Sequence, residues 1–251
     1  MAKPVSVQLY SVREACKADF FGTLKKIAAM GYAGVEYAGL HNKPAAEVAK
    51  VVKDLGMKSS SAHAGIPNKD TIGRIVDEAG ALGYTRVIGG FGSKDMETED
   101  AVKACAAKFQ AGVELGKAHG LSVGMHNHWW EFDRKFNGKT PYEIIMSAAP
   151  GLFSELDIYW STKGGADSCA VVRQWARRIP ILHVKDGDLE PDNMHKAVGD
   201  GKVPIRAIVE AADASVLDWL VVELDNCKTD MFEAVARSVK WLVSQGLGKG
   251  R

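Results

Sequence analysis

The sequence lacks the features that mark several common protein classes. Cysteine is scarce, and no two cysteines form a CxxC pair; the four are Cys16, Cys105, Cys169 and Cys227. We therefore expect reduced thiols, with neither a disulfide framework nor a zinc-ribbon site. No run of about 18 apolar residues exists, so no membrane-spanning helix is predicted. The chain as given starts without a leader-like apolar segment, and we expect a cytoplasmic protein unless a leader has been removed.

An excess of charge of either sign is also missing. The chain has 32 basic and 31 acidic residues, which give a net charge of +1. Binding to nucleic acid or to a membrane surface usually requires a clustered basic excess, so neither partner is expected. The sequence also has no GxxxxGK[ST] loop and no arginine cluster at a strand end, so it predicts no cradle for a phosphate group.

What the sequence contains is a regular alternation of short apolar runs and longer amphipathic runs. The expected strands are 5–10, 33–38, 58–63, 85–90, 121–127, 152–158, 181–184 and 219–224. The expected helices are 18–30, 45–55, 70–82, 98–119, 141–148, 166–177, 204–212 and 230–245. Such an alternation without a linker favours a parallel sheet covered by helices.

Two parallel architectures fit this alternation, a closed barrel and a doubly wound open sheet. No glycine-rich phosphate fingerprint follows the first strand, and polar residues end strands throughout the chain, which favours the barrel. The length of 251 residues also matches a barrel of this kind, typically about 250 residues. We therefore predict a single (β/α)8 TIM barrel domain over residues 1–251.

Four consecutive expected strands end in side chains that can bind metal. These are His126, Asp157, His183 and Glu223. The active site of a barrel lies at the carboxyl ends of its strands, where alternate residues point inward. Buried imidazoles and carboxylates are costly unless they are paired or metal-bound. The four residues predict a site for a divalent metal, either Mn, Co, Zn or Mg, because imidazole ligands argue against calcium.

Further polar and aromatic residues lie near these strand ends. Four residues share a strand face with the predicted metal ligands: His128, Glu155, Lys185 and Asp225. The second and third strands end in Glu36 and His63. Aromatic residues at a barrel mouth suit the apolar face of a sugar. We predict substrate contacts by His128, Trp129, Trp160, Glu155 and Glu36. Structural roles are the alternative to function for several of these residues. Glu36 would form an ion pair, His63 would be a core residue, His128 would hydrogen-bond a metal ligand, and the tryptophans would pack between loops.

Several motifs, in order along the chain, resemble those of a known family. They are Gln8–Arg13 (QLYSVR), Gly31–Glu36 (GYAGVE), His126–Phe132 (HNHWWEF), Glu155–Trp160 (ELDIYW), His183–Asp186 (HVKD) and the Gly199–Gly201 turn (GDG). The set resembles the xylose isomerase-like TIM barrel superfamily, in its sugar phosphate isomerase/epimerase group. It covers nearly the whole chain, is specific for the family, and does not specify a reaction.

The resemblance implies a metal held by a Glu on strand five, an Asp after strand six, a His in strand seven and a Glu in strand eight. Asp157, His183 and Glu223 match the last three positions, whereas His126 stands where the better-understood relatives have Glu. In the epimerases of the superfamily both glutamates also exchange protons with the substrate. Glu223 keeps that role by resemblance, and its catalytic partner is left open among His126, His63 and Lys185.

The sequence therefore predicts a metal-dependent sugar isomerase or epimerase, which removes a proton next to a carbonyl and passes through an enediolate. Because the same step begins a β-elimination, a lyase or hydratase acting on a keto-sugar or keto-glycoside is the first alternative. A metal-dependent phosphodiester hydrolase of the endonuclease IV type is the second, which the near-zero net charge disfavours. A non-enzymatic sugar- or metal-binding barrel is the third. A small carbohydrate is the expected partner, and the resemblance also allows a homodimer.

Overall fold

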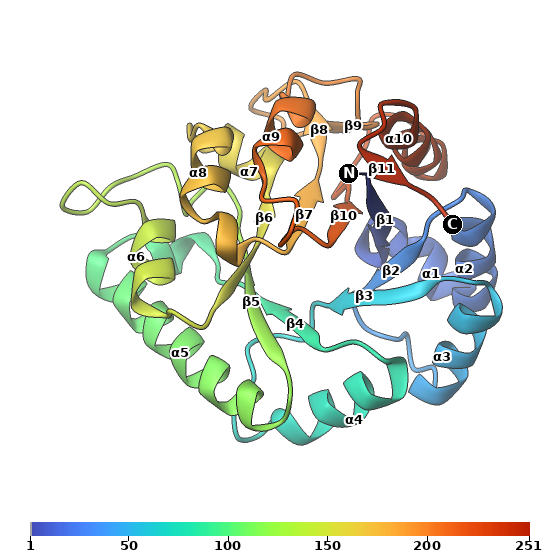
Figure 1. The fold of residues 1–251 in the computed structure, drawn as a ribbon, viewed down its shortest axis with the longest axis horizontal. Helices are drawn as coiled ribbons and strands as arrows, with labels where there is room; N and C mark the ends of the chain where they lie inside the picture. The colour runs from blue at the N-terminus through green and yellow to red at the C-terminus, as the bar shows by residue number, and fades with distance from the viewer. Residues whose placement is uncertain (1) are drawn as a thin grey trace.

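Eight parallel strands close on themselves into a barrel, and the helices lie around its outside (Figure 1). Around the barrel the order is β1, β2, β3, β4, β5, β6, β7 and β10, and pairing of β10 with β1 completes the ring. The computed structural model describes residues 2–251. The predicted (β/α)8 barrel is therefore confirmed.

The strand and helix bounds follow the expected alternation closely. The barrel strands are β1 (Lys3–Gln8), β2 (Gly34–Tyr37), β3 (Lys58–Ala62), β4 (Arg86–Gly89), β5 (Ser122–His126), β6 (Phe153–Asp157), β7 (Ile181–Val184) and β10 (Trp219–Val222). The helices are α1 (Arg13–Ala18), α2 (Phe20–Ala29), α3 (Ala45–Asp54), α4 (Ile72–Leu82), α5 (Glu99–Ala118), α6 (Pro141–Ala148), α7 (Ile158–Lys163), α8 (Ser168–Gln174), α9 (Ile205–Ala211) and α10 (Met231–Ser244). Short 3-10 turns occur at η1 (Leu9–Val12), η2 (Ser93–Met96) and η3 (Ala176–Arg178).

Three short strands and two helices, α1 and α7, were not predicted. β8 (Asp186–Gly187) and β9 (His195–Lys196) pair antiparallel in the loop after β7. β11 (Gly248–Lys249) pairs with the start of β1 and joins the end of the chain to the barrel. Helix α7 begins directly after β6, and the Asp157 side chain accepts a hydrogen bond from the Trp160 N–H at its first turn, at 2.8 Å.

The predicted helix 18–30 is α2 in the structure, which begins at Phe20 because Asp19 is its N-cap, and α1 precedes it. Asp19 has an extended backbone (φ −152°), and its carboxylate accepts a hydrogen bond from the Gly22 N–H at 2.9 Å. This contact is typical of an N-cap, where a short polar side chain satisfies a free N–H of the first turn. The first strand was predicted to reach residue 10, but β1 ends at Gln8. The rest of the QLYSVR motif forms η1 and the start of α1.

The barrel interior has an apolar layer below a polar one. Ile88, Phe153, Ile181 and Val221 form a small buried cluster inside the barrel. Three of these residues are followed, two positions further along the chain, by a polar residue. Glu155 follows Phe153, His183 follows Ile181 and Glu223 follows Val221. Because alternate residues of a strand point to the same face, the polar side chains lie directly above this cluster, toward the carboxyl ends. Within residues 2–251, no helix is both long enough and apolar enough to cross a membrane.

Candidate metal centre and active site

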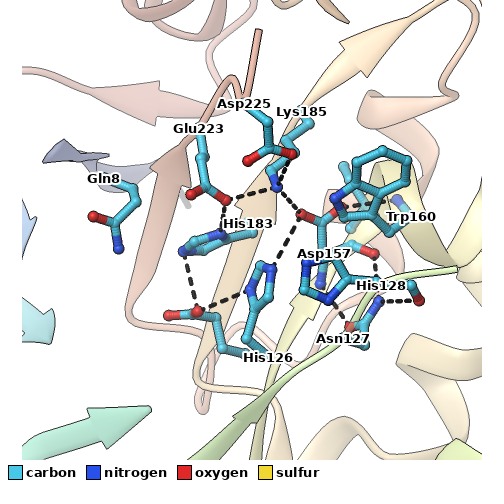
Figure 2. Close-up of polar contacts among 12 residues, drawn as sticks. Gln8, His126, Asn127, His128, Asp157, Trp160, His183, Lys185, Glu223 and Asp225 are labelled. Carbon is cyan, nitrogen blue, oxygen red and sulfur yellow. Dashed lines mark hydrogen bonds and ion pairs between the residues drawn. The ribbon is translucent and has the colours of Figure 1, made fainter. Parts of the chain in front are cut away.

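The four strand-end residues predicted as metal ligands lie together at the mouth of the barrel (Figure 2). His126 ends β5, Asp157 ends β6, His183 lies in β7, and Glu223 follows β10. Each offers a nitrogen or oxygen atom, and these atoms all lie within 4.8 Å of one another. All four side chains are buried. We call this set the outer cluster.

Lys185 lies beside the outer cluster and contacts three carboxylates. Its Nζ atom is 3.0 Å from Asp157 Oδ2, 2.7 Å from Glu223 Oε2 and 3.0 Å from Asp225 Oδ2 (Figure 2). Burial by itself lowers the pKa of this lysine, but the carboxylates outweigh burial and raise it well above the usual value. Lys185 therefore carries a buried positive charge at the mouth of the barrel.

A second group of polar residues lies deeper, against the same two histidines. Glu155 Oε2 is 2.6 Å from His63 Nε2, 3.2 Å from His126 Nδ1 and 3.1 Å from His183 Nε2. Glu36 Oε1 is 2.6 Å from His183 Nε2, and both glutamates are fully buried. The ligand atoms of His63, His126, Glu155 and His183 also lie within 4.8 Å of one another, and we call them the inner cluster.

The protonation states of His126 and Glu223 suit metal donors. Burial lowers the pKa of His126 well below its usual value, which leaves a neutral imidazole with a free lone pair. Burial raises the pKa of Glu223, but Lys185 and His183 outweigh burial and bring it well below the usual range. Burial raises the pKa of Asp157 to about 6 against the opposing charge of Lys185.

His183 differs from His126 because two carboxylates face it. Burial would lower its pKa, but the charges of Glu155 and Glu36 raise it well above the usual value. Glu36 itself has a raised pKa, caused first by burial and then by repulsion from Glu155. Carboxylate oxygens thus face both nitrogens of the His183 ring, those of Glu36 and Glu155 at Nε2 and that of Glu223 at Nδ1, and they accept its N–H groups.

These residues fit a divalent cation. Two imidazole nitrogens and two carboxylate oxygens form a mixed donor set that zinc, manganese and cobalt accept. Asp157 Oδ2 is buried and accepts no hydrogen bond within residues 2–251, although the Lys185 ammonium lies 3.0 Å away. A buried oxygen with unused acceptor capacity, next to three other donors, is suited to coordination.

An aromatic wall borders the outer cluster on the β5 and β6 side. The rings of His128 and Trp130 are stacked with centroids 4.2 Å apart, and those of Trp129 and Trp160 are 4.9 Å apart. Lys185 Nζ lies 5.4 Å from the centre of the Trp160 ring, which joins this wall to the outer cluster. Within the described chain, His128 Nδ1 and Trp160 Nε1 are buried without a partner, so both are free to bind a hydroxyl group.

Two supporting residues were not predicted, although both belong to motifs in the sequence. Asn127 holds the backbone of Asp157 in place, with its Oδ1 accepting from Asp157 N–H at 2.9 Å and its Nδ2 donating to Asp157 O at 3.2 Å. Gln8 donates to Glu36 Oε1 at 2.7 Å. The HNH and QLYSVR motifs contain these residues, but strand alternation alone does not reveal which neighbour each side chain reaches.

The loop after β7 depends on Asp186. Its carboxylate accepts backbone hydrogen bonds from Gly187, Gly199, Gly201 and Val203, at 2.9 to 3.2 Å. A Cβ atom on Gly201 would lie 2.1 Å from Asp186 Oδ1, so only glycine allows this close approach. Asp186, the last residue of the HVKD motif, therefore stabilises the Gly199–Gly201 turn by hydrogen bonds.

His195 reaches the site through this loop, and nothing in the sequence indicated it. The side chain is fully buried, and its Nδ1 accepts a hydrogen bond from Asp225 N–H at 3.0 Å. Its ring lies 5.3 Å from that of Trp160. Gly187 pairs with His195 between β8 and β9, so this pairing places His195 beside Asp225 and the aromatic wall.

The comparisons with known proteins agree with this architecture. A sequence profile described as "Xylose isomerase-like TIM barrel" matches residues 24–245, and the chain belongs to this family. Among curated proteins, no sequence matches the chain significantly.

Solved structures resemble the chain along nearly its whole length. A sugar phosphate isomerase/epimerase from Parabacteroides distasonis superposes with a TM-score of 0.82 at 23% identity, covering 99% of this chain and 96% of that one. A probable 3-DHS dehydratase from Bacillus anthracis gives 0.73 at 14% identity, with 96% and 98% covered. The IolI protein, whose structure has a bound zinc atom, gives 0.71 at 14% identity, with 97% and 98% covered. At these identities the likeness demonstrates a shared fold.

Proposed function

We propose that this protein is a metal-dependent sugar isomerase or epimerase that acts on a small carbohydrate. The observation that carries the proposal is the position of Glu223, an ionised carboxylate within the outer cluster and 2.7 Å from the Lys185 ammonium. A carboxylate and a cationic donor side by side can remove a proton next to a carbonyl and stabilise the negative charge that develops on the oxygen.

His126, Asp157, His183 and Glu223 would hold the divalent cation, with Mn, Co, Zn or Mg as candidates. When bound, the cation supplies Lewis acidity that polarises a substrate carbonyl. The IolI structure with zinc shows that a barrel of this fold can bind such a metal.

The remaining steps are proposed for the side chains of this chain. Glu223 accepts the proton from the carbon next to the carbonyl, and the positive charge of Lys185 stabilises the developing oxyanion. His63 is the best placed of the three candidate partners to return a proton. Its side chain is 26% exposed, whereas that of His126 is 7% exposed and Lys185 is fully enclosed. His63 Nε2 also pairs with Glu155, which can stabilise a protonated imidazole.

The aromatic wall would bind the sugar. Trp129 and Trp160 offer ring faces to its C–H groups, and the unpartnered nitrogens of His128 and Trp160 can bind its hydroxyls. Glu36 and Glu155 are fully buried and engaged with the histidines, so for these two a contact with the substrate remains a prediction.

A β-eliminating lyase or hydratase is the alternative that the same residues support. Glu223 would again remove the proton, and loss of a hydroxyl group from the next carbon would replace reprotonation. The resemblance in fold to a probable dehydratase is compatible with this reaction.

One experiment separates these possibilities. The metal content of the purified protein is measured first, and the protein is then incubated in deuterium oxide with a panel of keto-sugars. An isomerase or epimerase incorporates solvent deuterium and yields a sugar of unchanged composition, whereas a lyase yields a product that has lost water. A protein that binds no divalent metal and exchanges no proton would contradict the proposal.

A further inference from the structure

Glu155 occupies an unusual position, because a single carboxylate oxygen touches three imidazole rings. It lies on β6 two residues before Asp157 and points into the barrel on the same face. Its Oε2 atom is 3.1 Å from His183 Nε2, 3.2 Å from His126 Nδ1 and 2.6 Å from His63 Nε2. Its side chain is fully buried.

The nitrogens that face Glu155 are not those that face the outer carboxylates. On His126, Nδ1 faces Glu155, while Nε2 lies 3.9 Å from Asp157 Oδ2. On His183, Nε2 faces Glu155, while Nδ1 lies 3.0 Å from Glu223 Oε2. Figure 2 shows these two rings next to each other, with Asp157 and Glu223 on the outer side. Each ring therefore has one nitrogen directed toward the interior and one toward the outer cluster.

This arrangement determines which nitrogen can bind a metal. A neutral imidazole carries a proton on one nitrogen and a lone pair on the other. A carboxylate next to His126 Nδ1 and His183 Nε2 holds protons on those atoms. A cation in the outer cluster would displace the proton that His183 Nδ1 shares with Glu223, so that the lone pairs of His126 Nε2 and His183 Nδ1 become the donors. Both lone pairs then point into the outer cluster.

We infer that Glu155 is a positioning residue, whose carboxylate orients His126 and His183 together so that they bind the cation through Nε2 and Nδ1, respectively. The inference rests on the proposed function, because it assumes a cation in the outer cluster. It also accounts for the histidine at position 126, since a glutamate there would place its carboxylate against that of Glu155.

Glu36 cannot take over this task. Its Oε1 reaches His183 Nε2 at 2.6 Å and Gln8 Nε2 at 2.7 Å, and its Oε2 accepts from Ser61. Among the described residues, no contact joins Glu36 to His126. Loss of Glu36 should therefore affect one of the two rings, whereas loss of Glu155 should affect both.

The competing explanation is that the inner cluster itself holds a second cation, with Glu155 as a direct ligand. The inner and outer clusters share His126 and His183, so two cations would require both rings to lose both protons. The hydrogen-bond distances from Glu155 to all three rings favour the positioning role instead.

The test measures metal binding and ring protonation, independently of catalysis. Metal-free wild type, Glu155→Gln and Glu36→Gln are titrated with Zn²⁺ in competition with a chelator. Glu131→Gln is the matched control, because its buried carboxylate accepts from the His128 backbone N–H at 2.8 Å and, within the described residues, pairs with neither His126 nor His183. Thermal unfolding of each variant verifies that it is folded.

We expect one Zn²⁺ per wild-type chain, an affinity 10- to 100-fold lower in Glu155→Gln, as found for other residues that orient metal ligands, and a smaller loss in Glu36→Gln. The control should stay within about twofold of wild type. In ¹⁵N-labelled wild type loaded with Zn²⁺, the ring signals should show metal on His126 Nε2 and His183 Nδ1. This last readout needs no variant.

Different failures have different meanings. Unchanged affinity in folded Glu155→Gln, metal on His126 Nδ1, or two cations per chain would overturn the inference and leave the proposed function standing. A wild-type protein that binds no Zn²⁺, Mn²⁺, Co²⁺ or Mg²⁺ would overturn both.

Discussion

Lys185 Nζ lies 2.7 Å from Glu223 Oε2, and this contact joins the two residues to which we assign removal of the proton and stabilisation of the resulting negative charge. The same ammonium contacts Asp157 and Asp225, so one buried lysine balances three carboxylates. Stability and chemistry at the mouth of the barrel therefore depend on the same charges.

Replacing Glu223 by Gln should abolish exchange of the substrate proton without unfolding the protein. Gln has nearly the same volume but cannot accept a proton, and a positioned acid or base contributes about 10²- to 10⁴-fold to the rate. We expect solvent deuterium uptake to fall by that factor. Glu210→Gln, an exposed position on α9, is the control and should behave as wild type. Unchanged deuterium uptake in Glu223→Gln would exclude Glu223 as the base.

Replacing Lys185 by Met should destabilise the protein strongly. Asp157 and Glu223 would remain buried without their cationic partner, and breaking a buried pair in this way costs about 3–5 kcal/mol. Urea unfolding in the presence of a chelator measures the change without a contribution from metal. Lys196→Met, which removes a half-exposed pair with Asp188, should cost less than about 1 kcal/mol. A similar small loss for both variants would mean that Lys185 does not balance the carboxylates.

Replacing His126 by Glu, the residue that the resemblance implies for a strand-five metal ligand, should destabilise the chain unless Glu155 changes too. The new carboxylate would face Glu155 Oε2, now 3.2 Å from His126 Nδ1, and a buried like-charge pair is unfavourable. We expect a loss of about 1–3 kcal/mol in the single variant and partial recovery in the double variant with Glu155→Gln. Additive effects in this double-mutant cycle would show that the two positions do not interact.

Glu131 should make the stability of the protein depend on pH. Burial raises the pKa of its carboxyl from 4.5 to about 8, although the His128 backbone N–H opposes this. The folded state therefore favours the protonated form, and this contribution is complete below pH 4.5 and is lost as the pH rises through about 8.

Gln does not titrate, so the Glu131→Gln variant does not share the loss of stability that wild type shows as the pH rises. The free energy of unfolding of the variant, relative to that of wild type, should therefore increase between pH 5 and pH 9. We expect a change on the order of 2 kcal/mol in urea unfolding. Asp133→Asn, which removes a neighbouring exposed carboxylate, should keep the wild-type profile. A constant difference between Glu131→Gln and wild type would show that Glu131 is ionised throughout.

Replacing Asp186 by Ala should loosen the loop after β7. Four backbone N–H groups would lose their acceptor, and we expect a loss of about 2–3 kcal/mol because water can replace part of these bonds. Limited proteolysis should then cut between residues 187 and 203 faster than in wild type. Asp188→Ala, in the same loop but at its surface, is the control. Equal cleavage rates in the two variants would contradict the role of Asp186.

Much of the fold and part of the site could be predicted from local patterns. The alternation of apolar and amphipathic runs indicated the barrel, and the two-residue period of the strands placed Glu155 with Asp157 and Lys185 with His183 on common faces. The start of α2 was predicted at residue 18 instead of Phe20, because the N-cap contact of Asp19 decides where the helix begins and helical periodicity does not reveal it. Helix α7 was missed because its residues, Ile158–Lys163, follow β6 without an intervening turn signal.

The sequence by itself determined which side chains are available at the strand ends, because strand period and polarity are local properties. The tertiary structure decided which atoms meet. Closure of the barrel brings Glu36 within 2.6 Å of His183, across 147 residues, and directs one nitrogen of each ring inward and the other outward. Such pairings depend on strand register and ring orientation, which arise only when all eight strands pack together. Glu155 was therefore visible in the sequence, but its contact with three histidines was not.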